Sequence, residues 1–166
     1  KNEKSSLLSI AIIKKDDIEK IEKKVPRNTN IELNISCPNV EKDNCIENLS
    51  CFLNDERKWC IVKLSPVTSH KTIDNLYNMG FRQFHCCNTL PIKEGGLSGP
   101  KVKPYSLEMI KYIKQNYKDT EIIGGGGIQT INDISDYKKA GADHFSISTL
   151  CFNPLKFLMF YKYFLS

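Results

Sequence analysis

Six short apolar segments recur along the chain, and each is followed by a stretch with a different, helical periodicity. The apolar segments lie at 7–13, 31–36, 59–64, 81–87, 121–124 and 144–148. They are rich in β-branched and aromatic residues and are almost continuously apolar, which is typical of strands buried on both faces of a sheet. Strands that alternate with helices at this spacing predict an α/β fold with a parallel sheet.

Amphipathic patterns between these segments predict the helices, which we expect over 15–25, 70–79, 105–117 and 130–140, and from about residue 154. Gly80 and Gly141 mark the ends of two of them, because glycine is favoured just past the last helical turn. Pro104 and Thr130 are residue types that favour helix starts. The chain has no low-complexity linker, so we expect residues 1–166 to form one domain.

Charge and cysteine content narrow the class of protein. The formal net charge is +5, but the lysines alternate with acids, as in KKDDIEKIEKK at 14–24. This pattern is typical of a solvated helix face, so we predict no nucleic-acid partner. Seven irregularly spaced cysteines fit neither a disulfide framework nor a zinc site, so we expect reduced thiols and a cytoplasmic location. No apolar run reaches the roughly 18 residues of a membrane helix, and we predict no membrane association.

Unusual residues lie where the predicted strands end. Cys37 and Asn39 follow the second strand, Lys63 lies late in the third, and Asn88 and Thr89 follow the fourth. A closed barrel and an open doubly wound sheet both fit the alternation, and both bind ligands at the carboxyl ends of their strands. These residues are therefore candidates for a functional site in either architecture.

The sequence GGGGI at 124–128 joins a predicted strand to a helix. Glycines let backbone amides approach a ligand closely, and the start of the following helix favours a phosphate. The segment lacks the Lys-Ser/Thr of a Walker loop and the third glycine of a dinucleotide fingerprint. We interpret it as a phosphate-binding turn, to which Ser148 and Thr149 would add donors, with a plain flexible turn as the alternative.

Each of three further sequence features has two possible interpretations. The segment GGLSGPKVKP at 95–104 is either a ligand-covering loop or a long surface loop. Lys63, in an apolar strand, either contacts a bound anion or an electron-rich ring, or extends its ammonium to solvent. Cys37 is either an activated base or nucleophile, or a buried apolar side chain, and no histidine can be assigned as its partner.

Read together, six motifs resemble the flavin-dependent dihydroorotate dehydrogenases, and in particular the soluble class whose base is a cysteine. The motifs are ELNISCPN, VKLSP, CNTLP, GGLSGPKVKP, IIGGGGI and HFSIST, in the family's order over most of residues 30 to 150. The resemblance implies a TIM (β/α)8 barrel that binds FMN and oxidises dihydroorotate to orotate in pyrimidine biosynthesis.

The resemblance also implies roles for individual residues. Cys37 would be the general base that removes the C5 proton of dihydroorotate, and the hydride from C6 would pass to FMN. Residues that match pyrimidine contacts are Asn34, Asn39, Asn88 and Thr89. Residues that match FMN contacts are Asn34, Lys63, Cys87, Ser98, Gly99, Gly126, Gly127, Ser148 and Thr149, the last four around the phosphate. The resemblance implies no metal.

The length of the chain departs from this family. A complete barrel has eight strands and about 250 residues, whereas these 166 residues give six strands that resemble strands three to eight. We therefore expect an incomplete barrel of about six β/α units that lacks the first two strands, and the start at Lys1 without a methionine leads to the same expectation. Three explanations of the missing strands stay open. The chain is a fragment of a longer enzyme, it is a non-catalytic remnant, or a partner chain or a second copy completes the barrel.

Other FMN barrels are alternatives for the function. The related barrel of dihydropyrimidine dehydrogenase also uses a cysteine, so the substrate ring is less firmly implied than the flavin. The tRNA dihydrouridine synthases combine FMN with a cysteine as well, but GGLSGPKVKP at 95–104 fits the dihydroorotate dehydrogenases better. A remnant that binds flavin or phosphate without catalysis is the third alternative.

Overall fold

The computed structural model describes residues 6–35, 46–93 and 95–165. Its main sheet has six strands in the order β1-β2-β3-β4-β7-β8, and all of their pairings are parallel. The strands are Leu8–Ala11, Ile31–Asn34, Cys60–Lys63, Gln83–Cys86, Glu121–Gly125 and His144–Ser146. The six predicted strands and their parallel arrangement are confirmed.

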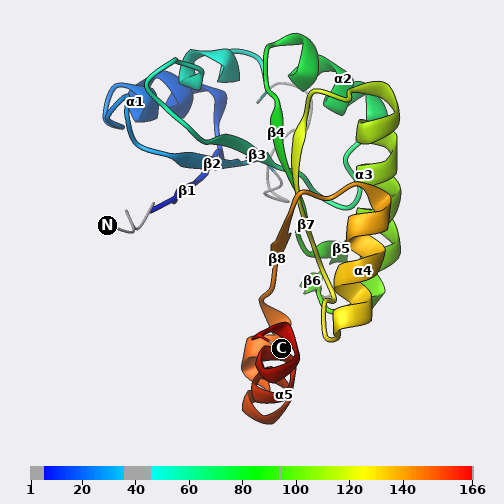
Figure 1. Cartoon of the computed structure of the whole chain (residues 1–166). Coiled ribbons are helices and arrows are strands. Elements are labelled where there is room, and N and C mark those ends of the chain that lie inside the picture. The colour runs from blue at the N-terminus through cyan, green and yellow to red at the C-terminus, as the bar shows by residue number, and fades with distance from the viewer. Residues whose placement is uncertain (1–5, 36–45, 94, 166) are drawn as a thin grey trace.

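Helices lie along one side of the curved sheet (Figure 1). They are α1 (Ile18–Glu22), α2 (His70–Asn78), α3 (Lys103–Asn116) and α4 (Ile131–Ala140), and a fifth helix, α5 (Pro154–Leu165), follows β8. Four 3-10 helices accompany them: η1 (Lys15–Asp17), η2 (Leu49–Phe52), η3 (Pro100–Val102) and η4 (Thr149–Phe152).

The helix predicted over 15–25 is shorter than expected and divides into η1 and α1. Pro26 disfavours the helical conformation at the residue before it, so the helix ends ahead of that point. The other boundaries agree with the sequence signals. Gly80 and Gly141 both have φ of 109° after α2 and α4, and Thr130 caps α4 through a reciprocal capping box with Asp133.

The core lies between the sheet and the helices. Alternate strand residues such as Leu33, Val62 and Phe84 are completely buried and share one apolar cluster with Ile73 of α2 and Ile110 of α3. Burying a side chain of this size stabilises the fold by about 1.5–3 kcal/mol each. The apolar residues that recur every second position in the strands therefore pack against those that recur about every 3.6 positions in the helices.

The opposite side of the sheet, which we call the inner face, carries Glu32, Ile61, Lys63, His85 and Ile123. Glu32 on β2 reaches past β3 to His85 on β4, with 2.6 Å between the carboxylate oxygen and Nδ1. The rings of Trp59, just before β3, and His144 on β8 meet edge-on at 5.3 Å. Contacts that skip intervening strands require strong curvature, as in the wall of a barrel.

The fold is thus an incomplete α/β barrel. Within the described residues the sheet ends at β1 and β8, each of which pairs with a neighbour on one side only. The expectation of strands that are apolar on both faces is wrong for the inner face, where Glu32 and His85 are buried polar side chains.

The segment after β4 contains a hairpin that the sequence did not predict. β5 (Leu90–Ile92) and β6 (Gly95–Leu97) pair antiparallel. Pro91 and the glycines at 95 and 96 have low β-propensity, so this region reads as a loop. Only part of 95–104 is irregular, because η3 and the first turn of α3 take up its second half.

The C-terminal helix α5 lies beyond the end of β8 (Figure 1). Phe152, Leu155, Leu158 and Met159 at and near its start are all exposed. In the part of the chain that the structure describes, no helix combines the length and the apolar character needed to cross a membrane.

Candidate functional site

The carboxyl ends of β2, β3 and β4 bring predicted site residues together. Asn34 and Lys63 are the last residues of β2 and β3 and are register partners in the sheet. Asn88 follows β4, and its Nδ2 donates to Oδ1 of Asn34 at 3.3 Å. Two carboxamides 54 positions apart in the chain therefore meet beside a lysine, an arrangement that offers donors and acceptors together.

The other residues predicted to contact a pyrimidine are less well defined. Thr89 is exposed, and its backbone N–H donates to Oδ1 of Asn88 at 2.8 Å, which orients that carboxamide. Cys37 and Asn39 lie outside the described residues. The predicted base and one predicted pyrimidine contact therefore stay predictions.

Lys63 has a partner inside the protein. Its ammonium lies 3.5 Å from Oε1 of Glu32, and its side chain is 24% exposed. Burial favours the protonated form of Glu32, but the hydrogen bond from His85 and the charges of His85 and Lys63 outweigh it, so the pKa of Glu32 is lowered to about 2. Glu32 is therefore a carboxylate at neutral pH, and Lys63 is paired rather than simply extended to solvent.

Cys87 follows β4 and lies against the glycine turn. A Cβ added to Gly125 would come within 3.1 Å of the Cβ of Cys87, and one added to Gly126 within 3.5 Å of its Sγ. Burial raises the pKa of the Cys87 thiol, so the neutral thiol is favoured at this position. Cys87 is therefore a packing neighbour of the turn.

The two glycine-rich motifs touch each other. Gly126 and Gly127 have φ of 98° and 71°, a left-handed conformation that favours glycine. A Cβ on Gly127 would lie 2.6 Å from the Cα of Pro100 and 2.8 Å from the carbonyl oxygen of Gly99. The backbone of Gly99 therefore lies beside the turn, as a shared cofactor site would require, and Ser98 is the residue before it.

Tyr137 supports the glycine turn from below, a role that the sequence did not reveal. The side chain is completely buried, and its hydroxyl donates to the carbonyl oxygens of Gly125 at 2.6 Å and Gly126 at 2.7 Å. Burial raises the pKa of this phenol, so it stays protonated. In the sequence Tyr137 only reads as one more core residue of a helix.

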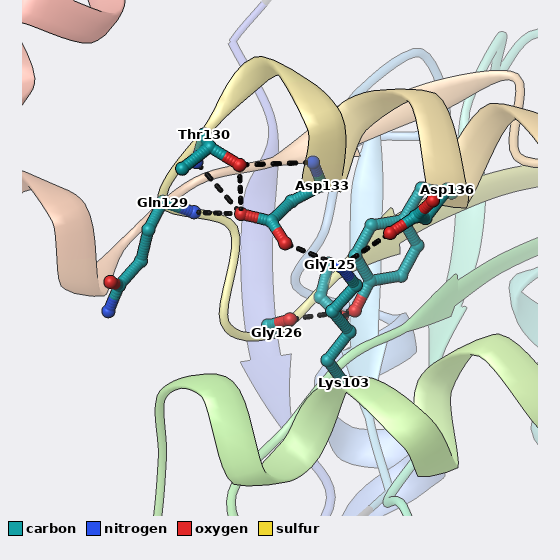
Figure 2. Close-up of polar contacts among 8 residues, drawn as sticks. Lys103, Gly125, Gly126, Gln129, Thr130, Asp133 and Asp136 are labelled. Atoms are coloured by element: carbon teal, nitrogen blue, oxygen red, sulfur yellow. Dashed lines mark hydrogen bonds and ion pairs between the residues drawn. The ribbon is translucent and has the colours of Figure 1, made fainter.

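The start of α4 is occupied by the protein's own carboxylate (Figure 2). Oδ2 of Asp133 accepts from the backbone N–H of Gln129 at 3.0 Å and of Thr130 at 2.8 Å. Lys103 of α3 donates to Asp133 and, at 2.8 Å, to Asp136. Burial opposes the charge on Asp133, but the bonds from Lys103, Gln129 and Thr130 prevail and lower its pKa to about 2.

This arrangement bears on the prediction for a phosphate. The sequence pointed to the N-terminus of the helix after the glycine turn, and Asp133 binds the N–H groups of Gln129 and Thr130, which lie between that turn and the start of α4 at Ile131. The other predicted phosphate contacts are Gly126 and Gly127 in the turn, and Ser148 and Thr149 just after β8. Because β7 and β8 are paired neighbours, both sets lie at the same edge of the sheet.

The described part of the molecule also has a hollow of about 250 Å³ at the opposite edge. Ser6, Leu7, Asn30, Trp59, Ile61, Ile123 and His144 line it. Most of these residues lie at or before the strands' amino ends, away from the residues described above. In parallel sheets this edge serves stability rather than ligand binding. Among the described residues no cluster of His, Cys, Asp or Glu is arranged to hold a metal.

Replacing Tyr137 with phenylalanine should lower the free energy of unfolding by about 1–2 kcal/mol, because two buried carbonyls lose their donor. Urea denaturation would measure the change. Tyr117→Phe is the control, since that hydroxyl bonds Asp74 at the surface rather than the glycine turn, and its effect should be smaller. An equal loss in both variants would contradict a supporting role for Tyr137.

Comparison with known proteins places the chain in a family. Residues 3–158 match the family profile described as dihydroorotate dehydrogenase. The catalytic subunit of dihydroorotate dehydrogenase B (NAD(+)) from Lachnoclostridium phytofermentans is 35% identical over 151 residues, covering 75% of this chain and 50% of that protein. The corresponding subunit of Malacoplasma penetrans is 33% identical over 184 residues, covering 92% of this chain and 60% of the relative.

Solved structures support the same fold. Dihydroorotate dehydrogenase of Eimeria tenella, crystallised with ferulenol, superposes with a TM-score of 0.63 at 21% identity, covering 82% of this chain and 49% of that one. Its ligand-free form gives the same TM-score at 22% identity. The chain spans about half the length of the curated relatives it matches. It belongs to the dihydroorotate dehydrogenase family.

Proposed function

We propose that this chain carries the FMN- and pyrimidine-binding part of an enzyme that oxidises dihydroorotate to orotate, with Cys37 as the general base. The observation that carries the proposal is the meeting of Asn34 and Asn88, 3.3 Å apart, beside Lys63 at the carboxyl edge of the sheet. Family membership supplies the reaction, and this cluster supplies side chains suited to a pyrimidine.

The residues present fit FMN. Gly126, Gly127 and Gly99 have positive φ, and Gly127 packs against the backbone of Gly99 and Pro100. Glycines carry no side chain that would keep a ligand away from the backbone N–H groups of this turn. Ser148 and Thr149 add hydroxyls for the phosphate, and Lys63 adds a positive charge near the ring. When bound, FMN would supply the two-electron acceptor that no protein side chain provides.

The protein residues would then bind, orient and deprotonate the substrate. The carboxamides of Asn34, Asn39 and Asn88, with the hydroxyl of Thr89, would hold the polar edge of the pyrimidine. Cys37 would take the proton from C5 while the hydride leaves C6 for the flavin, and the C5–C6 double bond of orotate forms. A positioned general base of this kind contributes about 10²–10⁴-fold to the rate.

Among the described residues no strand pairs with the outer side of β1 or of β8, which favours two accompanying proposals. Further polypeptide, from the same protein or from a partner chain such as a second copy, would complete the wall between them. A chain without that wall would bind FMN or phosphate without turnover, which makes a non-catalytic flavin-binding protein the second candidate function.

Anaerobic titration of the purified chain with FMN and then with dihydroorotate tests the proposal. Flavin that binds and then loses its visible absorbance on addition of dihydroorotate would support the dehydrogenase. Binding without loss of absorbance would favour the second candidate. A chain that takes up no FMN, alone or with its partner, would refute both.

A further inference from the structure

A polar cluster on the inner face lies directly behind the proposed site. Each of the four neighbouring strands β1 to β4 contributes one member: Ser9, Glu32, Lys63 and His85. Glu32 is at its centre, because its carboxylate contacts the other three side chains. Neither the family's motifs nor the proposed chemistry assigns a role to Glu32 or His85.

The geometry fixes the carboxylate in place. Nδ1 of His85 lies 2.6 Å from Oε2 of Glu32, and since a carboxylate only accepts, this nitrogen donates. The hydroxyl of Ser9 donates to Oε1 at 2.9 Å. The side chains of Glu32 and His85 are each only 7% exposed. Nε2 of His85 is buried and has no partner among the described residues.

Stability alone does not explain this cluster. A buried carboxylate loses its hydration, and apolar residues of similar size usually stabilise such a position equally well. Two other positions of the inner face, Ile61 and Ile123, are apolar. Lys63 is the last residue of β3, with its ammonium 3.5 Å from Glu32, and its side chain is 24% exposed whereas those of Glu32 and His85 are each 7% exposed.

We propose that Glu32 is a positioning residue for Lys63, an inference that rests on the proposed function. Held by His85 and Ser9, the carboxylate anchors the ammonium at the edge of the flavin site and offsets its charge. The flavin ring would therefore meet a lysine whose charge Glu32 partly offsets, rather than a lone cation. This arrangement would keep the reduction potential of the bound flavin lower than an unpaired lysine would.

The proposal can be tested first without flavin. In Glu32→Gln the ammonium of Lys63 loses its counterion, so its acetylation by an N-hydroxysuccinimide ester should become about fivefold faster, relative to exposed Lys111. The chain is acetylated briefly while folded, and mass spectrometry of its peptides then measures the rate at each lysine. Glu121→Gln is the matched control, because Glu121 also pairs with a histidine, His144 at 2.7 Å, but at the other edge of the sheet.

The second measurement is the midpoint potential of bound FMN. An uncompensated Lys63 stabilises the more negative reduced flavin, so Glu32→Gln should shift the two-electron equilibrium about tenfold toward reduction, a rise of about 30 mV. Glu121→Gln should leave the potential unchanged. A purely structural role for Glu32 predicts no such rise.

The two arms separate the outcomes. Faster acetylation in Glu32→Gln alone supports the positioning role, and equal rates in the two variants overturn it. A rise in potential supports the link to the flavin, and an unchanged potential overturns that link. If the wild-type chain binds no FMN, the proposed function fails, but the acetylation rates still show whether Glu32 pairs with Lys63. If Glu32→Gln does not fold, Ser9→Ala should give a smaller acceleration, and no acceleration would overturn the proposal.

Discussion

Replacing Cys37 with alanine should abolish the bleaching of bound flavin by dihydroorotate while FMN still binds. The variant lacks the base that takes the C5 proton, so the rate of anaerobic bleaching should fall about 10²–10⁴-fold. Stopped-flow absorbance with a fixed, saturating concentration of dihydroorotate measures this rate directly. The dissociation constant for FMN should stay within about twofold, because the carried-over FMN contacts do not include Cys37.

Cys51→Ala is the matched control for this experiment. Cys51 is an exposed free thiol in η2, beside α1, and its pKa is raised by burial and by the nearby charge of Glu22. Its thiol therefore stays protonated at neutral pH and cannot accept a proton, and its removal should leave bleaching unchanged. A Cys37→Ala chain that bleaches at the wild-type rate would exclude a base at this position. Slow bleaching by Cys37→Ser would agree with a hydroxyl that replaces the thiol less effectively.

Replacing Gly127 with alanine should have the largest effect on stability. Its φ of 71° is strained for alanine, and the new Cβ would lie 2.6 Å from the Cα of Pro100 and 2.8 Å from the oxygen of Gly99. Both neighbours are backbone atoms and cannot rotate away, so the segment around Pro100 must shift. We expect the free energy of unfolding to fall by about 2–4 kcal/mol and FMN affinity to fall with it.

A Gly95→Ala variant is the control that separates backbone strain from the steric clash of the new Cβ. Gly95 also has a positive φ, 135°, but a Cβ on it would meet no atom within 4 Å. Gly95→Ala should therefore cost only the conformational part, about 1 kcal/mol. Urea denaturation of both variants gives the difference. Losses of equal size would mean that the contact between the two glycine-rich segments contributes nothing beyond local strain.

The strands could be predicted because their signal is local. Segments such as Cys60–Lys63 and Glu121–Gly125 are short and apolar, and turn residues bound them, so neighbouring residues suffice. The β5–β6 hairpin could not be predicted, because Pro91 and two glycines suppress the same local signal. That hairpin exists through its pairing with a segment across a short turn, and no propensity scale encodes this pairing.

The candidate site likewise has a part that the sequence predicts and a part that it does not. Asn34, Lys63 and Asn88 could be placed at one edge because parallel strands all end there. Glu32 and His85 could not be connected, since they are 53 positions apart and meet only because the sheet curves past β3. Thr130 could be predicted as the start of α4, but the bonds from the N–H groups of Gln129 and Thr130 to Asp133 depend on atomic positions.

The outer strands of the sheet have one further consequence. If β8 of one copy paired with β1 of the next, the parallel hydrogen bonding would continue, and the new pair would again present a free β1 and a free β8. Such a contact is head-to-tail, so copies would add into a closed ring where the curvature brings the last β8 back to the first β1, and into a filament where it does not. The polypeptide that completes the wall would then also block this contact between copies. The fraction of the chain that stays as single copies should therefore rise with the amount of that polypeptide.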